Sequence, residues 1–435
     1  MKKNKLRSSV VMFLILSTML LTTLFGSMIY KGKVTAQRAE EERLAELQRI
    51  EDERQAKIAA GPDTFKRAVK DDMGVPAEVM KVITDYLDLY FRSMYRLELQ
   101  DDSNLFSREY YSTLSKYANQ LIVESRKLYD FDFRMHDAAY ELEVTDYSNE
   151  DGFYYVTVLE HDYFDFNFLD DNDPTLDAGI TSSAYNIESV FKIEQVNGAY
   201  KINSLYKEQG FFIMFYDETN GVEDFPDLYN YYLGKMSDLI KFEKEQKQLA
   251  LTNGYTSTKT FNTAYNRNAA AEYAYAYCYN RNPEWYCFDD TGGNCQNFAS
   301  QAILAGGIPM DYQGDYQWKH FGEGPDIELE INEAPEPSGR SQSWVNVNFF
   351  AEYAQSNIGY GMVAEIVPNI GFMEPGDIIQ VSYDSPSEMA HTTIVTKVVD
   401  GHPLVCSNTL DLRDFPVEAY TYPYRRFIKI LGSNQ

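Results

Sequence analysis

The chain has 435 residues, a length that favours two or three domains with accessory segments. Its net charge of −27 argues against a nucleic-acid partner, because phosphate binding needs clustered Lys and Arg. The four cysteines are too few for a disulfide scaffold and show no CxxC spacing, so no metal or other cofactor is indicated. Whether Cys278 and Cys287 form a disulfide or stay free thiols is left open by the sequence.

The amino terminus predicts export. Basic residues up to Arg7 precede an uncharged, mostly apolar run over residues 10–30, long enough to span a bilayer. Basic residues on the leading side predict a cytoplasmic amino terminus. Residues 1–36 are therefore a membrane anchor or a signal segment, and residues 34–36 offer a cleavage site. The prediction is a single-pass membrane protein whose later domains are extracellular, or a secreted protein if the signal is cleaved.

Residues 37–62 are dense in Glu, Arg and Ala with only a thin apolar stripe, which is typical of a solvated helical stalk. Residues 63–251 follow as an α+β domain. Helical spacing over residues 79–97 and 110–129 comes first, and alternating strands over residues 140–202 come next. Asn197 and Gly198 mark a hairpin turn. Helices followed by a curled antiparallel sheet resemble the cone-shaped nuclear-transport-factor-2-like (NTF2-like) fold by pattern only. This middle domain is predicted to be a spacer or to bind a partner protein.

The most specific pattern lies in the last domain, residues 255–435. Gly292 and Gly293 precede Cys295, which begins a helical stripe of Phe298 and later alanines. A thiol on the first turn of a helix feels the positive end of the peptide dipoles, which favours thiolate over thiol. Cys295 is therefore a candidate nucleophile.

A hairpin supplies the partners of Cys295. Strand patterns at residues 390–399 and 402–408 flank Asp400 and Gly401, a two-residue turn signal. Counting back from this turn places Asn408 opposite residue 393, on the sheet face of His391. A turn of odd length would reverse that face and give the role to Thr409 or Asp411.

The spacing predicts a Cys–His–Asn site. Cys295 is the nucleophile, His391 is the general base and later the acid, and Asn408 orients the imidazole. The backbone N–H of Cys295 is the expected oxyanion donor. The other four histidines show no metal-ligand spacing, and the chain has no P-loop and no GxSxG elbow.

These residues carry a resemblance to a known family. The matching stretches are residues 265–267, 294–301 (Asn-Cys-Gln-Asn-Phe-Ala-Ser-Gln), 305–307, 344, 376–379, 391–396 (His-Thr-Thr-Ile-Val-Thr) and 408–411. In order and spacing they resemble the bacterial putative amidase domain family, which is similar to the papain-like CHAP and NlpC/P60 cell-wall hydrolases. The resemblance covers about residues 265–425. It implies a cysteine hydrolase of peptidoglycan amide bonds, with Cys295 as nucleophile and His391 as base.

Two positions depart from the family pattern. The usual Asp before the cysteine is Asn294, and the histidine that often precedes Thr409 is Asn408. Trp344 and Asp377 are interpreted as scaffold.

The predicted fold class is α+β, with an N-terminal transmembrane helix and stalk, an NTF2-like domain and a papain-like C-terminal domain with an antiparallel sheet. The predicted function is an exported, membrane-anchored amidase or endopeptidase whose partners are peptidoglycan or wall peptides. The alternative is a non-catalytic tethered scaffold that binds wall peptides or envelope proteins. The sequence does not distinguish the sugar–peptide amide from a peptide crosslink as the bond cleaved.

Overall fold

The computed structural model describes residues 38, 40, 42–50, 52–53, 56, 61–169, 182–219, 224–313, 316–322 and 330–435. Contacts divide the chain into two units, Met1–Gly61 and Pro62–Gln435. In the first unit the described residues from Arg38 to Ala56 are helical and exposed. Arg49 pairs there with Glu46 and Glu53, one turn to either side. These features are those expected of the predicted stalk.

The predicted fold class needs a correction. The segment predicted to span a membrane, residues 10–30, lies outside the described residues. Within the described ranges, no helix combines the length and apolar character needed to cross a bilayer. The fold is a mixed α/β one with a large sheet that runs through residues 62–435.

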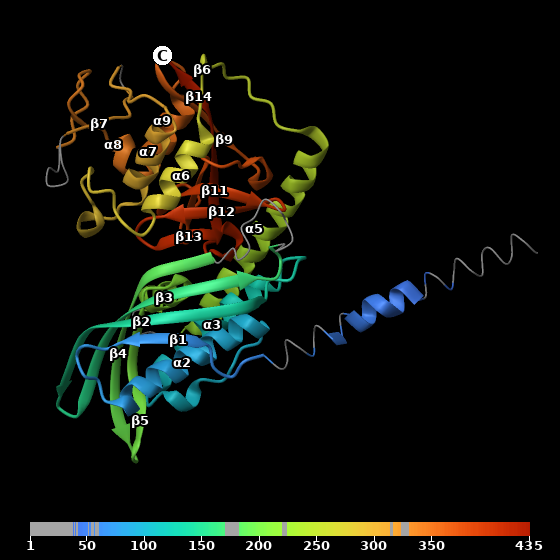
Figure 1. The fold of residues 1–435 in the computed structure, drawn as a ribbon, viewed down its shortest axis with the longest axis vertical. Helices are drawn as coiled ribbons and strands as arrows, with labels where there is room; N and C mark the ends of the chain where they lie inside the picture. The colour runs from blue at the N-terminus through green and yellow to red at the C-terminus, as the bar shows by residue number, and fades with distance from the viewer. Residues whose placement is uncertain are drawn as a thin grey trace, which may run out of the picture. The chain divides into compact units, whose positions relative to one another are not determined.

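The second unit contains the following elements (Figure 1). Its helices are α2 (Ala77–Arg96), α3 (Glu109–Arg126), α4 (Gly210–Thr219), α5 (Phe225–Asn253), α6 (Arg267–Tyr277), α7 (Cys295–Ala305), α8 (Gln342–Val345) and α9 (Val347–Ser356), with 3₁₀ turns η1 (Ser103–Leu105), η2 (Asp289–Thr291), η3 (Ile370–Phe372) and η4 (Val417–Ala419). Its strands are β1 (Lys66–Lys70), β2 (Met135–Glu150), β3 (Phe153–Phe166), β4 (Ser182–Val196), β5 (Ala199–Lys207), β6 (Thr263–Ala264), β7 (His320–Phe321), β8 (Gly339–Arg340), β9 (Gly361–Val367), β10 (Ile378–Ser382), β11 (His391–Val399), β12 (His402–Ser407), β13 (Asp411–Pro416) and β14 (Tyr424–Asn434).

The middle part has the predicted helix-then-sheet order. Helix α2 buries an apolar face against β2, where the rings of Phe91 and Tyr140 stack at 5.3 Å. Strands β2 to β5 follow as an antiparallel meander. Asn197 and Gly198 both have positive φ and join β4 to β5, which confirms the predicted hairpin.

One sheet joins the two parts. Strand β4 pairs with β3 on one side and with β13 on the other, and the order continues through β12, β11, β10 and β14. Asp411 faces Tyr185 and Arg413 faces Ser183 in the β13–β4 ladder. The green strands of the middle part therefore lie next to the red strands of the C-terminal part (Figure 1).

The C-terminal strands bury both faces. Ile378, Ile394 and Cys406 belong to a core shared with α6, α7 and α9. Their neighbours, such as Val395 and Val405, belong to the larger core that extends into the middle part. This alternation follows from the two-residue period of a strand. Alternate residues along a strand therefore face α7, as Ile394 does, or the middle part, as Val395 does.

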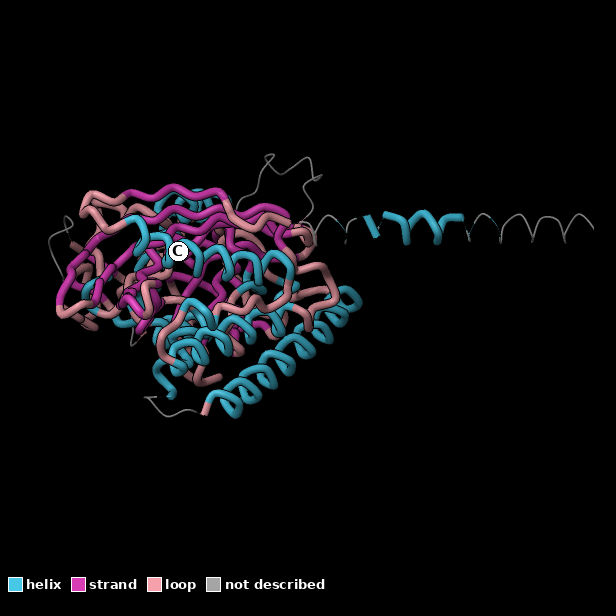
Figure 2. Tube along the Cα trace, turned by 90° about the horizontal axis from the view of Figure 1, so that it is seen from below, coloured by secondary structure: helices cyan, strands magenta, loops and turns pink. Residues whose placement is uncertain are grey.

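Side chains reinforce the joint between the parts. Asn186 donates to Asp411 at 2.7 Å, and the rings of Tyr185 and Tyr279 stack at 3.9 Å. Helix α5, the longest of the described helices, runs along the outside of the unit (Figure 2). From it, Glu243 accepts two 3.0 Å hydrogen bonds from the buried Arg425 guanidinium on β14.

This ion pair should be a major stabilising contact. Glu243→Ala leaves the Arg425 charge buried without its carboxylate, so we expect the free energy of unfolding to fall by about 3–5 kcal/mol. The matched control is Lys244→Ala, which removes a pair with Asp130 whose side chains are 66% and 65% exposed. That loss should stay below about 1 kcal/mol. Urea unfolding of both variants measures the difference, and equal losses would contradict this account.

Candidate active site

The loop before Cys295 is shaped by glycine. Gly292 and Gly293 have φ values of 119° and 100°, a region that L side chains rarely adopt. A Cβ on Gly293 would also lie 3.5 Å from the Thr409 side chain. These two residues let the chain turn sharply into α7, whose first residue is Cys295.

Asn294 ties this loop to the end of the β12 strand. Its backbone N–H donates to the Thr409 hydroxyl at 2.8 Å, and its side-chain amide donates to the Asn408 oxygen at 2.9 Å. Its own oxygen accepts from the backbone of Phe288 and from the amide of Asn297. The start of α7 is thereby fixed on three sides, and its first backbone N–H groups are left to act on the Cys295 sulfur.

The Cys295 sulfur lies beside the first residues of β11. Burial raises the pKa of this thiol, and the backbone N–H groups of Thr392, Gln296 and Cys295 itself act in the opposite direction. Gln296 also accepts from the Thr392 hydroxyl at 2.9 Å, which locks α7 to β11. The positive helix end therefore acts on the thiol as predicted, but desolvation outweighs it.

His391 begins β11, one residue before Thr392. The imidazole is buried, 6% exposed, and burial lowers the pKa of His391 to about 4. It shares a strand face with Val395, so it points to the side of the middle part. Its ring lies 6.3 Å from that of Tyr420, and its Nε2 has no hydrogen-bond partner among the described residues.

No hydrogen bond between described residues joins the Cys295 sulfur to the His391 imidazole. Two neighbours link them indirectly: the backbone N–H of Thr392, next to His391, acts on the sulfur, and the charge of a Cys295 thiolate raises the pKa of the Tyr420 phenol. Burial lowers the pKa of His391 to about 4 and raises that of Cys295, so near neutral pH the two groups are a neutral imidazole and a neutral thiol.

No hydrogen bond between described residues joins Asn408 to the imidazole, and the observed register of the hairpin differs from the predicted one. Val399 does face His402, and Lys397 faces Leu404, as counted from the turn. A bulge at Thr396 then shifts the ladder by one residue, so Val395 faces Val405. The strand ends at Ser407, and the same-face prediction for Asn408 is wrong.

The Asn408 carboxamide is fully engaged elsewhere. It donates to the carbonyl oxygens of Tyr277 and Cys278 at 3.0 and 2.9 Å, and it accepts from Asn294. It therefore positions the end of α6 and the loop before Cys295. Thr409 and Asp411, the two alternative candidates for orienting the imidazole, also have other partners. Thr409 donates to Asp289, and Asp411 pairs with Arg281 at 2.8 Å.

A polar groove opens beside the glycine loop. Its volume is about 270 Å³, and its walls include Gly292, Gly293, Arg340, Gln342 and Asn346. Gly293 lies two residues before Cys295, so the groove adjoins the loop that leads into α7.

Sequence reasoning missed three residues that shape the site: Gln296, Thr392 and Tyr420. The first two lie beside predicted residues and could have been suspected from their position alone. Tyr420 lies between η4 and β14, outside any periodic pattern, and no sequence signal marked it.

The sequence left open whether Cys278 and Cys287 form a disulfide. In the structure both are free thiols, as are Cys295 and Cys406. Trp344 donates to Asn297, and Asp377 pairs with Arg267 and Lys429, as expected of scaffold residues.

Comparison with known proteins assigns this region. Residues 264–431 match the family described as "Putative amidase domain", which covers less than half of the chain. An uncharacterized protein of Bacillus subtilis (strain 168), YhbB, is 32% identical over 153 residues, or 34% of this chain. The match spans 43% of the length of that protein. No solved structure matches the chain. Residues 264–431 are thus similar to this amidase domain family.

The buried imidazole should make stability depend on pH. The folded pKa of about 4 lies below the ordinary value of 6.5, so between these values only the unfolded chain binds the proton. The contribution of the neutral His391 to the free energy of unfolding is complete above pH 6.5. It is lost as the pH falls to about 4, which lowers the free energy of unfolding by about 3 kcal/mol. His391→Asn should lose less stability than the wild type between pH 7 and pH 4. Urea unfolding at both pH values tests this, and identical losses would contradict it.

Asn408 should matter for stability. Asn408→Ala leaves two carbonyls and the Asn294 amide without their partner, so we expect a loss of about 3 kcal/mol. Asn408→Asp should be at least as harmful, because a carboxylate cannot donate to the carbonyls of Tyr277 and Cys278. Thermal and urea unfolding measure both variants. A loss below 1 kcal/mol in Asn408→Ala would refute the positioning role.

Proposed function

We propose that the C-terminal part is a cysteine-dependent hydrolase of peptide amide bonds, with Cys295 as nucleophile and His391 as general base. One observation carries the proposal: Cys295 stands on the first turn of α7, where the backbone N–H groups of Gln296 and of Thr392, the residue next to His391, act to lower the pKa of its thiol. The amidase-like match of residues 264–431 supports the bond class. The resemblance to papain-like cell-wall hydrolases supports the nucleophile.

The chemistry follows from these groups. His391 takes the Cys295 proton as the sulfur attacks the amide carbon, and the carbonyl π electrons move onto oxygen. Backbone N–H groups at the start of α7, those of Cys295 and Gln296, hold the resulting oxyanion. Collapse breaks the carbon–nitrogen bond, and the imidazolium protonates the leaving amine. Water, deprotonated by His391, then hydrolyses the thioester and restores the thiol.

The first step requires the imidazole to turn from Tyr420 toward the sulfur. Catalytic hydrogen bonds often tighten only when substrate is bound. Because burial keeps both groups neutral, the resting site holds a thiol and an imidazole rather than an ion pair. Proton transfer then coincides with attack.

The proposed substrate is a peptide of the bacterial cell wall. The groove of about 270 Å³ beside Gly292 and Gly293 is lined by Arg340, Gln342 and Asn346, whose polar groups suit the amides of a peptide. The exported location predicted from residues 1–36 remains a prediction, and a wall polymer fits a domain on that side. The middle part serves as the spacer or partner-binding module.

A second function is a binding module without catalysis. The missing Cys295–His391 hydrogen bond and the engagement of Asn408 favour it. Inactivation by a wall peptide that carries a chloromethyl ketone separates the two functions, because the peptide part delivers the electrophile to the nucleophile. A hydrolase should be alkylated at Cys295 before Cys278, Cys287 and Cys406, whereas a binding module should react slowly at all four.

Removal of the sulfur should abolish turnover. Cys295→Ala should lower the rate of peptide release from purified muropeptides by about 10³-fold or more, because alanine has no nucleophile to form the thioester. The matched control is Cys287→Ala, a half-buried cysteine near the same loop, which should stay within twofold. Equal release by the wild type and Cys295→Ala would end the proposal.

A further inference from the structure

A cavity lies where the middle and C-terminal parts meet. Its volume is about 90 Å³. Helix α3, β3 and β4 form one side, while β13 and the segment after η4 form the other. Apolar side chains dominate its walls, among them Phe164, Leu412 and Phe415. Tyr420, whose ring lies 6.3 Å from the His391 ring, belongs to the same walls.

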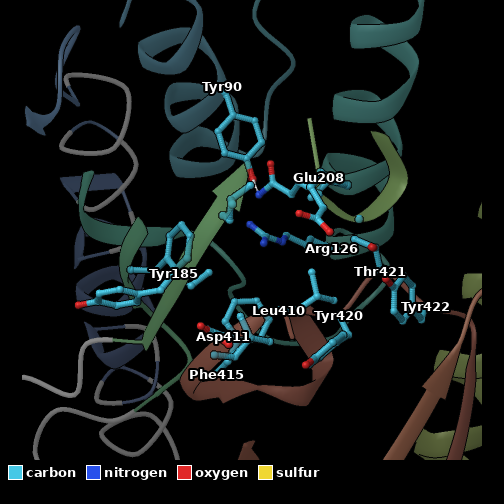
Figure 3. A pocket seen from close by; sticks show the side chains of 18 residues that line it. Tyr90, Arg126, Tyr185, Glu208, Leu410, Asp411, Phe415, Tyr420, Thr421 and Tyr422 are labelled. Carbon is cyan, nitrogen blue, oxygen red and sulfur yellow. Dashed lines mark hydrogen bonds between the residues drawn. The ribbon is translucent and has the colours of Figure 1, made fainter. Parts of the chain in front are cut away.

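Arg126, the last residue of α3, projects into this cavity (Figure 3). It is 7% exposed, and its Nε and Nη1 have no hydrogen-bond partner among the described residues. No ion pair with a described residue balances its charge. Its guanidinium lies over the rings of Phe133 and Phe166 at 5.1 and 5.6 Å.

The rings of Phe133 and Phe166 offset only part of the free-energy cost of burying the Arg126 charge. A cation–π contact contributes about 0.5–2 kcal/mol, whereas burying an unpaired ion costs several kcal/mol. Burial accordingly lowers the pKa of Arg126 to about 10, which leaves it charged at neutral pH. A buried fork of free N–H donors beside an open space matches a carboxylate in charge and geometry.

Two acidic side chains also line the cavity. Asp411 is already engaged by Arg281 and Asn186. Glu208 is half-buried on the same wall as Gln209, whose amide donates to the Tyr90 hydroxyl at 2.7 Å. No ion pair joins Glu208 to Arg126 in the described structure, and burial raises the pKa of Glu208. Glu208 is free to receive a cationic group from a ligand.

Size limits what can bind. An engineered cavity of about 150 Å³ holds one benzene molecule, so a cavity of about 90 Å³ suits a ligand of no more than about six non-hydrogen atoms. A carboxylate, a neighbouring ammonium and a short apolar branch fill that space and meet Arg126, Glu208 and Phe164 in turn.

We propose that this cavity is a binding site for the carboxylate of a small apolar amino acid of the size of alanine, with Arg126 as the carboxylate anchor and Glu208 as the ammonium partner. The inference stands on the cavity and does not depend on hydrolase activity. The same carboxylate chemistry is offered by a free amino acid and by the terminus of a peptide.

Calorimetric titration of the full chain tests the site with alanine, propionate, ethylamine and N-acetylalanine. We expect alanine to bind saturably. Arg126→Gln should weaken it at least tenfold, since two charge-assisted hydrogen bonds are lost. Glu208→Gln should weaken alanine but not propionate. The control Lys127→Gln, an exposed cation next to Arg126 on the sequence, should bind alanine like the wild type.

A second variant protects the test against misfolding of Arg126→Gln. Ala184→Leu fills the cavity from β4 without removing any charge, so it should abolish alanine binding in a folded protein. N-acetylalanine lacks the ammonium and exceeds the size limit, so it should bind at least tenfold more weakly than alanine, and equal binding of the two would contradict the role of Glu208. Alanine binding unchanged in Arg126→Gln or in Ala184→Leu, or no binding of any carboxylate, would overturn the proposal.

Discussion

The pairing of β13 with β4 is the contact on which the architecture depends. It turns the antiparallel strands of the middle part and those of the C-terminal part into one sheet. Backbone ladders leave little freedom for a change of register when both faces are buried. The faces of β11 and β12 are therefore fixed relative to the middle part. One consequence is that His391 points to the middle part, while α7 with Cys295 packs on the other face.

The same joint sets the electrostatics of the candidate site. A helix end contributes about 0.3–1 kcal/mol to an adjacent anion. The depression of the His391 pKa from 6.5 to about 4 corresponds to about 3 kcal/mol. Desolvation thus dominates at this site, and it acts on both partners toward the neutral forms. Catalysis by this pair requires the thiol proton to leave during attack, because no stable thiolate precedes it.

The sequence predicted local structure well and long-range placement less well. The helix that begins at Cys295, the hairpin turn at Asp400 and Gly401, and the first pairs of that hairpin follow from local patterns. The bulge at Thr396 does not, because its hydroxyl is held by the Leu404 carbonyl and by Asp414, a residue of the next strand. The shared sheet was also not predictable, since period-2 strands do not reveal which strand lies beside them. For this reason local patterns could not reveal the role that Asn408 takes, with its carboxamide bonded to Asn294, Tyr277 and Cys278.

The two departures from the family pattern are in contact with each other. Asn294 stands where the family usually has Asp, Asn408 where it often has His, and their carboxamides share a 2.9 Å hydrogen bond. An aspartate and a histidine at these positions would form a charged hydrogen bond in the same place. The two asparagines keep the hydrogen bond but carry no charge. Asn294 directly precedes Cys295, where a carboxylate would oppose a developing thiolate. Neutral amides therefore secure the loop without adding negative charge beside the sulfur, and the two substitutions act as one change.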